Sequence, residues 1–386
     1  MTNLMNPSKD PFRFLAPVVL VLAVAAATGT VADAQRRDVP MTADQWQLIL
    51  GKAEFKDHKG KQSLVMIAEG GAKLNDLTFR NGTIEFDVDP VAMGAGLGFR
   101  MRDDDTFEML YFRPKADCAT APDCTQYAPY THKVLLWDVF PQYQAPAPLR
   151  QNEWNHVKVV ISGRRMHLFV NGATSPALAV GSLEGDTQEG HLVLIGPGAF
   201  ANFTVTPDAV EGLATEPEAD PTAADDRFVR HWQIAPFSSL PEGSEPTVSD
   251  LPTPSTTWRR LTAERGGLVN ITRVYGLPVA RPARSLTWLK TTISSSKNQS
   301  KKTAIGWSRE VWVFVNGQRV YADKNLYQPP AARKPPDGRL SLQNGSFILP
   351  LKEGDNEVAV AVANNFYGWG LILRLDDLEG IQLARQ

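Results

Sequence analysis

The side chains best suited to chemistry lie between positions 100 and 127, where charged, amide and phenolic residues alternate with apolar ones. A guanidinium group donates hydrogen bonds in a fixed geometry, and a tyrosine combines an apolar ring with a hydroxyl group. Both properties suit a ligand rich in hydroxyl groups, such as a sugar. The alternative is a ladder of surface side chains that pair across two strands. We expect ligand contacts from part of this set: Arg100, Tyr111, Arg113, Gln126 and Tyr127.

Two glutamates are candidates for acid–base catalysis. Glu108 belongs to the same polar set, but an odd offset separates it from Tyr111, so a regular strand would turn the two side chains to opposite faces unless a bulge intervenes. Glu85 begins the pattern Glu85-x-Asp87-x-Asp89, which puts three carboxylates on one face of a strand. General acid and nucleophile chemistry needs two carboxylates. A solvated strand face gives the same pattern without any chemistry.

Aromatic side chains could provide flat surfaces that stack on a ligand. Trp369, which stands between Gly368 and Gly370, is the better surface candidate, although a glycine-flanked tryptophan also fits close packing of sheets. Trp154 opens an apolar segment and is expected in the core. The remaining candidates are Trp137, Tyr143, Trp312 and Tyr367.

Cys118 and Cys124 are the only two cysteines of the chain, and five residues separate them. In an oxidising compartment we expect a disulfide that fixes the loop between Arg113 and Gln126, and two free thiols are the alternative. The six histidines show neither HxH nor HExxH spacing, so we expect no metal site. The sequence also lacks a phosphate-binding loop, a dinucleotide fingerprint and a nucleophile elbow, and we expect no cofactor.

Short alternating segments must hold these residues in place. In GTIEFDV (82–88) the apolar residues Ile84, Phe86 and Val88 share one face, which is typical of a half-buried strand. Almost no helical period is present, so the pattern predicts an all-β fold built from two β-sandwich (jelly-roll) domains. The other expected strands are 94–101, 107–113, 132–139, 156–162, 165–170 and 191–195, and then 285–294, 311–315, 347–351, 356–363 and 370–375.

An acidic segment divides the chain. Residues 204–226 contain seven acidic residues and no Lys or Arg, a composition typical of a solvated linker. We therefore expect a first jelly roll at 35–205, an acidic linker at 206–257 and a second β-sandwich at 258–386. Residues 228–237, inside this linker, are expected to pack on a neighbouring domain.

The N-terminus has the features of a secretory signal peptide. A basic region with Lys9 and Arg13 precedes an apolar run at 15–27, and small residues offer a cleavage site after Ala34. The apolar run is too short to span a bilayer. We expect residues 1–34 to be removed and the protein to be periplasmic or secreted, without an integral membrane segment. The formal net charge of −2, from 40 basic and 42 acidic residues, argues against nucleic-acid binding.

Several segments occur in an order that resembles the concanavalin A-like lectin/glucanase superfamily, and in particular its LamG-like and 3-keto-disaccharide hydrolase-type exported bacterial domains. The resemblance implies a jelly roll of two sheets whose concave face can bind saccharide. Laminarinase-type enzymes of this superfamily use Glu-x-Asp-x-Glu, which residues 85–89 resemble, with a departure at Asp89. The segments that carry the resemblance are GTIEFDV (82–88), GLGFR (96–100), Glu108-x-x-Tyr111-x-Arg113-Pro114, QYAP (126–129), NEWN (152–155), VNG (170–172) and Phe203.

The second half is similar to the galactose-binding-like jelly rolls of bacterial carbohydrate-active proteins, through VFVNG (313–317), GDNE (354–357) and GWG (368–370). We therefore expect an exported carbohydrate-binding protein that recognises an oligosaccharide or polysaccharide on the concave face of its first jelly roll. One alternative is a glycoside-cleaving enzyme, hydrolytic or directed at 3-keto-glycosides, that uses Glu108 or Glu85. Another is a structural or adhesion protein whose C-terminal domain binds a protein partner.

Overall fold

A computed structural model describes residues 35–384, and nearly all of their regular structure is β-strand. The strands form four antiparallel sheets, which confirms the all-β prediction. The expected signal peptide lies outside the described residues. Between residues 35 and 384, no helix is long and apolar enough to cross a membrane. The helical elements in this range are α1 (Ile271–Tyr275) and the 3-10 turns η1 (Pro141–Tyr143), η2 (Val248–Asp250), η3 (Arg265–Gly267) and η4 (Pro330–Ala332).

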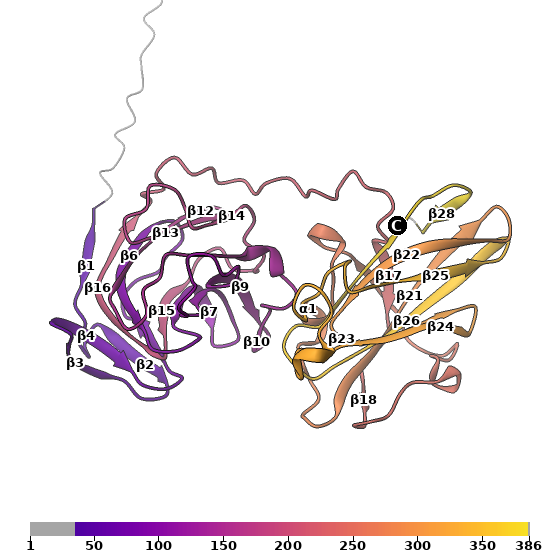
Figure 1. Cartoon of the computed structure of the whole chain (residues 1–386), viewed down its shortest axis with the longest axis horizontal. Coiled ribbons are helices and arrows are strands. Elements are labelled where there is room, and N and C mark those ends of the chain that lie inside the picture. The colour runs from indigo at the N-terminus through magenta and orange to yellow at the C-terminus, as the bar shows by residue number, and fades with distance from the viewer. Residues whose placement is uncertain (1–34, 385–386) are drawn as a thin grey trace, which may run out of the picture. The chain divides into compact units, whose positions relative to one another are not determined.

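Two sheets form the first sandwich (Figure 1). Sheet A runs in the order β14 (Leu178–Val180), β13 (Arg165–Val170), β12 (Asn155–Ser162), β6 (Gly82–Pro90), β16 (Gly198–Pro207), β4 (Lys61–Met66) and β3 (Glu54–His58), with β1 (Arg37–Val39) beside β16. Sheet B runs in the order β10 (Val134–Leu135), β9 (Thr125–Thr131), β8 (Thr106–Phe112), β7 (Gly96–Asp103), β15 (His191–Ile195), β5 (Gly71–Leu74) and β2 (Trp46–Leu50), with β11 (Gln144–Ala145) beside β9.

The second sandwich has the same two-layer construction. Sheet C runs in the order β19 (Arg259–Thr262), β17 (His231–Ile234), β21 (Arg284–Ser295), β26 (Gly354–Asn364), β23 (Arg309–Val315) and β24 (Gln318–Asn325), with β18 (Ser238–Leu240) and β28 (Ile381–Leu383) beside β21. Sheet D consists of β20 (Val269–Asn270), β27 (Gly370–Leu375), β22 (Gln299–Trp307) and β25 (Gly345–Leu351).

Period-two alternation explains how the strands build these cores. On β6, Ile84, Phe86 and Val88 are fully buried between sheets A and B, while Glu85 faces outward and is half-buried. Burying each such apolar side chain stabilises the fold by roughly 1.5–3 kcal/mol. Phe86 packs on Phe203 of β16, with ring centroids 5.9 Å apart. The face predicted for residues 82–88 is therefore the core face.

The strand expected at 132–139 is much shorter than predicted, since only Val134 and Leu135 pair as β10. Beyond it the backbone turns back on β9, and the Leu136 N–H donates to the Pro129 carbonyl at 3.0 Å. The apolar residues that suggested a strand are buried all the same, because this turn packs against the sandwich. Trp137 lies in the turn, next to the outer face of sheet B.

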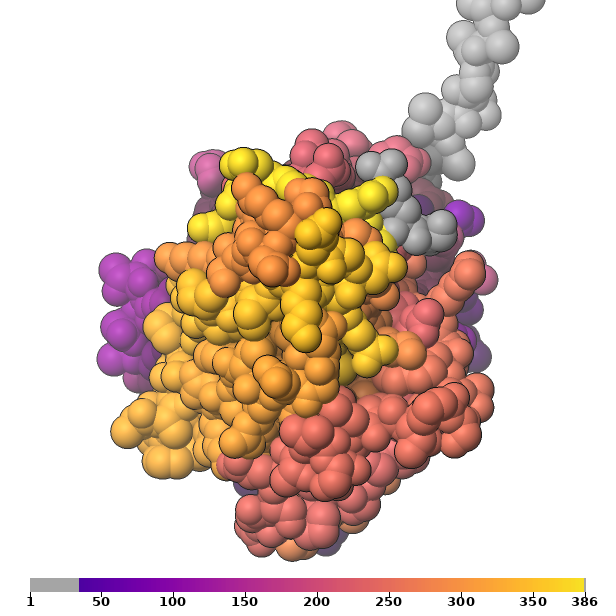
Figure 2. Space-filling model, turned by 90° about the vertical axis from the view of Figure 1, so that its right-hand side faces the viewer, coloured from indigo at the N-terminus to yellow at the C-terminus, as the bar shows by residue number. Residues whose placement is uncertain are grey.

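Part of the expected linker belongs to the second sandwich. Residues 228–237 pack there as expected, because β17 pairs with both β19 and β21. β18 also pairs with β21, so the chain after Asp226 contributes strands before residue 258. Figure 2 shows the coral-coloured residues of this region lying against the orange and yellow residues of the second sandwich. Where one domain ends and the next begins stays a prediction.

Candidate functional site

Strand β8 divides the predicted polar set between two faces of sheet B. It pairs with β9 in unbroken register from Thr106 to Phe112, so no bulge brings Glu108 and Tyr111 to one side. Glu108 lies on the core side with Leu110, and Tyr111 lies on the outer side with Met109. The expectation that these two residues cannot share a face is confirmed, and they belong to different environments.

On the outer face, three predicted ligand contacts bind one another. The Tyr111 hydroxyl lies 3.0 Å from Gln126 Oε1, and Arg113 Nη2 donates to the same oxygen at 2.6 Å. Gln126 Nε2 donates to the Trp137 carbonyl at 2.7 Å. Tyr111 and Gln126 are buried. Their polar atoms are therefore directed at each other and at the backbone of Trp137, so they act as supports for that residue.

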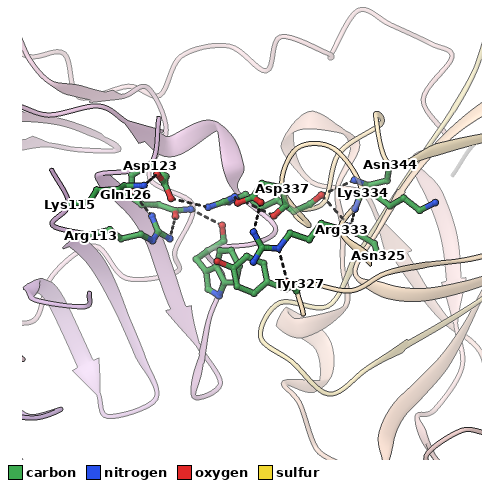
Figure 3. Close-up of polar contacts among 12 residues, drawn as sticks. Arg113, Lys115, Asp123, Gln126, Asn325, Tyr327, Arg333, Lys334, Asp337 and Asn344 are labelled. Carbon is green, nitrogen blue, oxygen red and sulfur yellow. Dashed lines mark hydrogen bonds and ion pairs between the residues drawn. The ribbon is translucent and has the colours of Figure 1, made fainter. Parts of the chain in front are cut away.

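The predicted disulfide is present and shapes the adjoining loop. Cys118 and Cys124 are bonded, with Cα atoms 5.3 Å apart. Next to this crosslink, Arg113 Nη1 donates to the Asp123 carbonyl at 3.0 Å. The Asp123 carboxylate lies 3.6 Å from Arg339 of the second sandwich. Figure 3 shows Asp123 beside its ion-pair partner Lys115. The loop thus connects the outer face of sheet B to the chain after β24.

On the core side, Glu108 and Tyr127 form a buried pair. The Tyr127 hydroxyl donates to Glu108 Oε2 at 2.6 Å and accepts from the Glu184 backbone N–H at 2.6 Å. Glu108 Oε1 is buried without a hydrogen-bond partner. Burial raises the pKa of Glu108 to about 7, although the Tyr127 hydrogen bond and Arg100 oppose this rise. Both side chains lie inside the sandwich and make no contact with its outer face.

Arg100 departs from its expected position because of a bulge. The pairing of β7 with β8 is irregular between Phe99 and Asp103, so regular strand alternation does not set the direction of this side chain. Arg100 has φ +52°, and its guanidinium group donates to the carbonyls of Arg80 and Gly163 at 2.7–2.9 Å. It is buried. Arg100, which we expected to contact a ligand, therefore links the segments around Arg80 and Gly163 through hydrogen bonds.

Trp369 is fully buried, so the interpretation as a surface platform is wrong and close packing is correct. Its ring belongs to the core of the second sandwich. The two glycines make this possible. A Cβ atom on Gly368 would lie 2.6 Å from Asp138 Oδ1, and one on Gly370 would lie 3.0 Å from a Leu268 methyl group.

The carboxylates of β6 lie on the outer face of sheet A, where cations and histidines surround them. Glu85 Oε2 lies 3.2 Å from His156 Nε2, and Asp87 Oδ1 lies 2.9 Å from His156 Nδ1. Lys61 donates to Asp87 at 2.7 Å. Trp154, which we expected in the core, is half-exposed beside this group. Asp87 and Asp89 are buried and paired with neighbouring cationic and histidine side chains, so the alternative of a solvated strand face fits only Glu85.

The structure gathers a group of aromatic residues that the sequence did not reveal as a unit. We call it the aromatic cradle. Phe107 and Tyr130 stack at 4.5 Å on sheet B, and Trp137 contacts Tyr327 and Tyr367 at ring distances of 5.0 and 5.6 Å. The cradle lies over the outer face of sheet B and draws residues from both sandwiches. Its members are Phe107, Tyr130, Trp137, Tyr327, Phe366 and Tyr367.

The cradle is only partly covered. Trp137 is buried at its centre, whereas Tyr367 is 41% exposed and held at φ +56°. Phe107, Tyr130, Tyr327 and Phe366 are half-buried. Aromatic side chains that are packed at one edge and open at the other can stack on a ligand without first becoming ordered.

Arginines border the cradle rings. The guanidinium carbon of Arg333 lies 4.2 Å from the Tyr327 ring centroid, that of Arg281 lies 5.0 Å from Phe366, and that of Arg339 lies 5.2 Å from Trp137. In these contacts the guanidinium groups lie over the rings, so they orient the rings and bring hydrogen-bond donors into the cradle.

Only Trp137 and Tyr367 of the cradle were among the sequence candidates. The signal for the others was weak, because aromatic residues are also the usual material of a core. One clue was present: Phe366 and Tyr367 are consecutive and lie between the strands predicted at 356–363 and 370–375. A connecting segment has little use for two aromatic side chains in a core, so their presence there indicates a surface role.

A second feature is a cavity of about 530 Å³ lined by charged residues from both halves of the chain, among them Glu184 and Arg265. Burial raises the pKa of Glu184, against the opposing effects of Tyr143 and Arg265. Tyr143 donates to Glu184 Oε1 at 2.5 Å. In residues 35–384, no group of three His, Cys, Asp or Glu side chains is arranged to hold a metal ion.

No protein-family model matches the chain, and a search of curated proteins found no match. Among solved structures, the carbohydrate binding module CBM66 from Bacillus subtilis is 14% identical, with a TM-score of 0.31 over 42% of this chain and 95% of that chain. A Bacillus subtilis protein of unknown function with a galectin-like fold is 16% identical, with a TM-score of 0.32 over 45% of this chain and 94% of that chain. Domain 4 of AbnA, an extracellular arabinanase from Geobacillus stearothermophilus in complex with arabinotriose, is 13% identical, with a TM-score of 0.25 over 43% and 85%. These scores are too low to support a functional conclusion.

Proposed function

We propose that the protein binds a glycan on the aromatic cradle. The observation that carries this proposal is the gathering of six aromatic side chains from both sandwiches on the outer face of sheet B, where Tyr367 stays 41% exposed. A sugar ring has an apolar face that stacks on an aromatic ring, and its hydroxyl groups need donors and acceptors at the edge. Tyrosine hydroxyls and arginine guanidinium groups supply them here.

This proposal changes the role of several residues predicted as ligand contacts. Tyr111, Arg113 and Gln126 lie behind Trp137, and Gln126 holds its carbonyl at 2.7 Å. They position the cradle and do not touch the sugar. Arg100 and Tyr127 stabilise the sandwich from within.

The test compares two aromatic residues of equal exposure. Tyr367 is 41% exposed in the cradle, and Phe237 is 42% exposed outside it. We expect Tyr367→Ala to weaken binding of the glycan selected from an oligosaccharide panel by about tenfold, the usual effect of losing a central aromatic contact. Phe237→Ala should bind like the wild type. Equal affinity of Tyr367→Ala and wild type, or no binding to any glycan on the panel, would overturn the proposal.

Glycoside cleavage is the second candidate function, and the two glutamates linked through Tyr127 are the reason to test it. Glu108 and Glu184 both have raised pKa values, and Tyr127 contacts the carboxylate of the first and the backbone of the second. Glu184 lines a cavity, whereas Glu108 is fully buried and Glu85 is partnered on the opposite sheet. Cleavage products that form with the wild type and disappear with Glu184→Gln would support an enzyme. Products that persist in Glu184→Gln, Glu108→Gln and Glu85→Gln would exclude these carboxylates.

We also infer that the protein functions outside the cytoplasm, in the periplasm or after secretion. The disulfide between Cys118 and Cys124 supports this inference, because such bonds persist in oxidising compartments. Detecting a mature N-terminus at Gln35 in the exported fraction would support it, and finding the full-length chain in the cytoplasm would contradict it.

A further inference from the structure

Two arginines at the edge of the cradle have little negative charge to balance them. Arg281 is exposed beside the Phe366 ring, and its Nε donates to the Asn365 carbonyl at 2.6 Å. Among the described residues it forms no ion pair with a carboxylate within 4 Å. Its two terminal nitrogens therefore remain available to an acceptor from outside the protein.

Arg309 lies close to this group and is also incompletely paired. It lines a small cavity with Trp137, Tyr327 and Phe366 of the cradle. Its Nε is buried without a hydrogen-bond partner, and Glu310 Oε1 is 3.9 Å away. The Arg309 side chain is nevertheless 28% exposed, so an acceptor from outside can approach the outer part of its guanidinium group and gain a charge-assisted hydrogen bond.

The nearest carboxylates are already engaged. Asp138 lines the same cavity and accepts a hydrogen bond from the Gly368 N–H at 2.9 Å, and burial raises its pKa to about 7. Glu310 Oε2 accepts a hydrogen bond from Arg284 and lies 3.7 Å from Lys324. Burial lowers the pKa of Arg309; Glu310 opposes this effect, and the positive charges of Arg281 and Arg284 add to it. The arginines thus repel each other next to the aromatic rings, and a bound anion would relieve that repulsion.

We propose that the glycan bound on the cradle is acidic, and that Arg281 and Arg309 receive the carboxylate of a uronic acid residue. This inference rests on the proposed function. A guanidinium group matches a carboxylate with two parallel hydrogen bonds, which a neutral hydroxymethyl group cannot accept. A sugar sulfate presents the same charge with tetrahedral geometry and is distinguished by the test.

The experiment measures binding of matched oligosaccharides to the purified chain. Oligogalacturonate, oligoglucuronate and oligomannuronate are each compared with the neutral oligosaccharide of the same linkage, and with a sulfated galactose oligosaccharide. At least one uronate should bind about tenfold or more tightly than its neutral partner. Raising the salt concentration from about 0.05 M to about 0.5 M should shrink this difference, because salt screens the charges.

Variants assign the effect to the two arginines. Arg281→Gln should weaken binding of the uronate by about tenfold more than binding of its neutral partner, because only the uronate loses a charge-assisted contact. Arg281 is exposed, so its loss does not disturb the core. Arg309→Gln should act in the same direction. Arg319→Gln, an exposed arginine on β24, is the control and should keep the preference.

The possible outcomes distinguish the proposal of an acidic ligand from the proposal that the cradle binds a glycan at all. Three results would overturn the proposal of a uronate ligand and leave the proposal of glycan binding intact. These are equal binding of neutral and acidic glycans, a preference for the sulfated glycan alone, and a uronate preference that is unchanged in Arg281→Gln. Failure of every glycan to bind would overturn both.

Discussion

Glu108 shows how a residue typical of an active site can serve inside a fold. Its spacing and type marked it as a catalytic candidate, yet the structure buries it beneath sheet B with Tyr127 as its hydrogen-bond donor. Its pKa of about 7 follows from burial, which penalises the charged form. Burial alone therefore explains the raised pKa of Glu108, and a catalytic role is not needed to account for it.

Glu108 should make stability depend on pH. Its pKa is about 7 in the folded chain against 4.5 ordinarily, so the folded protein holds this proton more tightly than the unfolded chain does. Its contribution to the free energy of unfolding is thus full below about pH 4.5 and falls as the pH rises through 7. Glu108→Gln removes this charge. We expect the free energy of unfolding of the variant to be higher than that of the wild type by up to about 3 kcal/mol at pH 8, and equal to it at pH 4. Urea unfolding at both pH values measures this, and parallel pH profiles would contradict it.

At the scale of elements, regular alternation was predictable and irregular backbone was not. The core face of β6 follows directly from GTIEFDV, and the all-β class follows from many such segments. Arg100 was misplaced because one bulge in β7 turns it away from its regular face. The cradle escaped prediction because Trp137 and Tyr367 are far apart in the sequence and meet only when the two sandwiches pack. Alternation describes single strands and carries no information about such packing.

The crosslinked loop should stabilise the chain and the cradle together. Replacing both cysteines, as in Cys118→Ser with Cys124→Ser, frees a short loop and should lower the free energy of unfolding by about 2 kcal/mol. Because the Asp123 carbonyl in this loop accepts from Arg113, glycan binding should weaken by a few-fold as well. Urea unfolding and calorimetric titration of the double variant measure the two effects. Unchanged stability would show that the loop is ordered without its crosslink.

At the scale of the molecule, buried contacts join the two sandwiches. The Gly368 N–H of the second sandwich donates to Asp138 Oδ1 of the first at 2.9 Å. Leu268 and Leu340 extend the core of the first sandwich, although they lie in the second half of the chain. Apolar and hydrogen-bonded contacts of this kind favour cooperative unfolding. The cradle depends on them, because half of its rings come from each sandwich.

Gly368 offers a way to loosen this junction. A Cβ atom there would lie 2.6 Å from Asp138 Oδ1 and 2.7 Å from a Val139 methyl group. We expect Gly368→Ala to cost about 1–3 kcal/mol through overpacking and to split a single calorimetric unfolding transition into two. Glycan binding should fall in parallel. If Gly368→Ala unfolded in one transition at the wild-type temperature, the contact between the two sandwiches would have accommodated the added methyl group without a loss of stability.

The most direct test of the central claim is hydroxyl-radical footprinting of the full chain with and without its glycan. Bound sugar should protect Tyr367, Phe366 and Tyr327 from oxidation and leave Phe237 and Trp154 unchanged, because only the first three belong to the cradle. Protection of Trp154, on the outer face of sheet A, with an unchanged Tyr367 would place the glycan elsewhere and contradict the account.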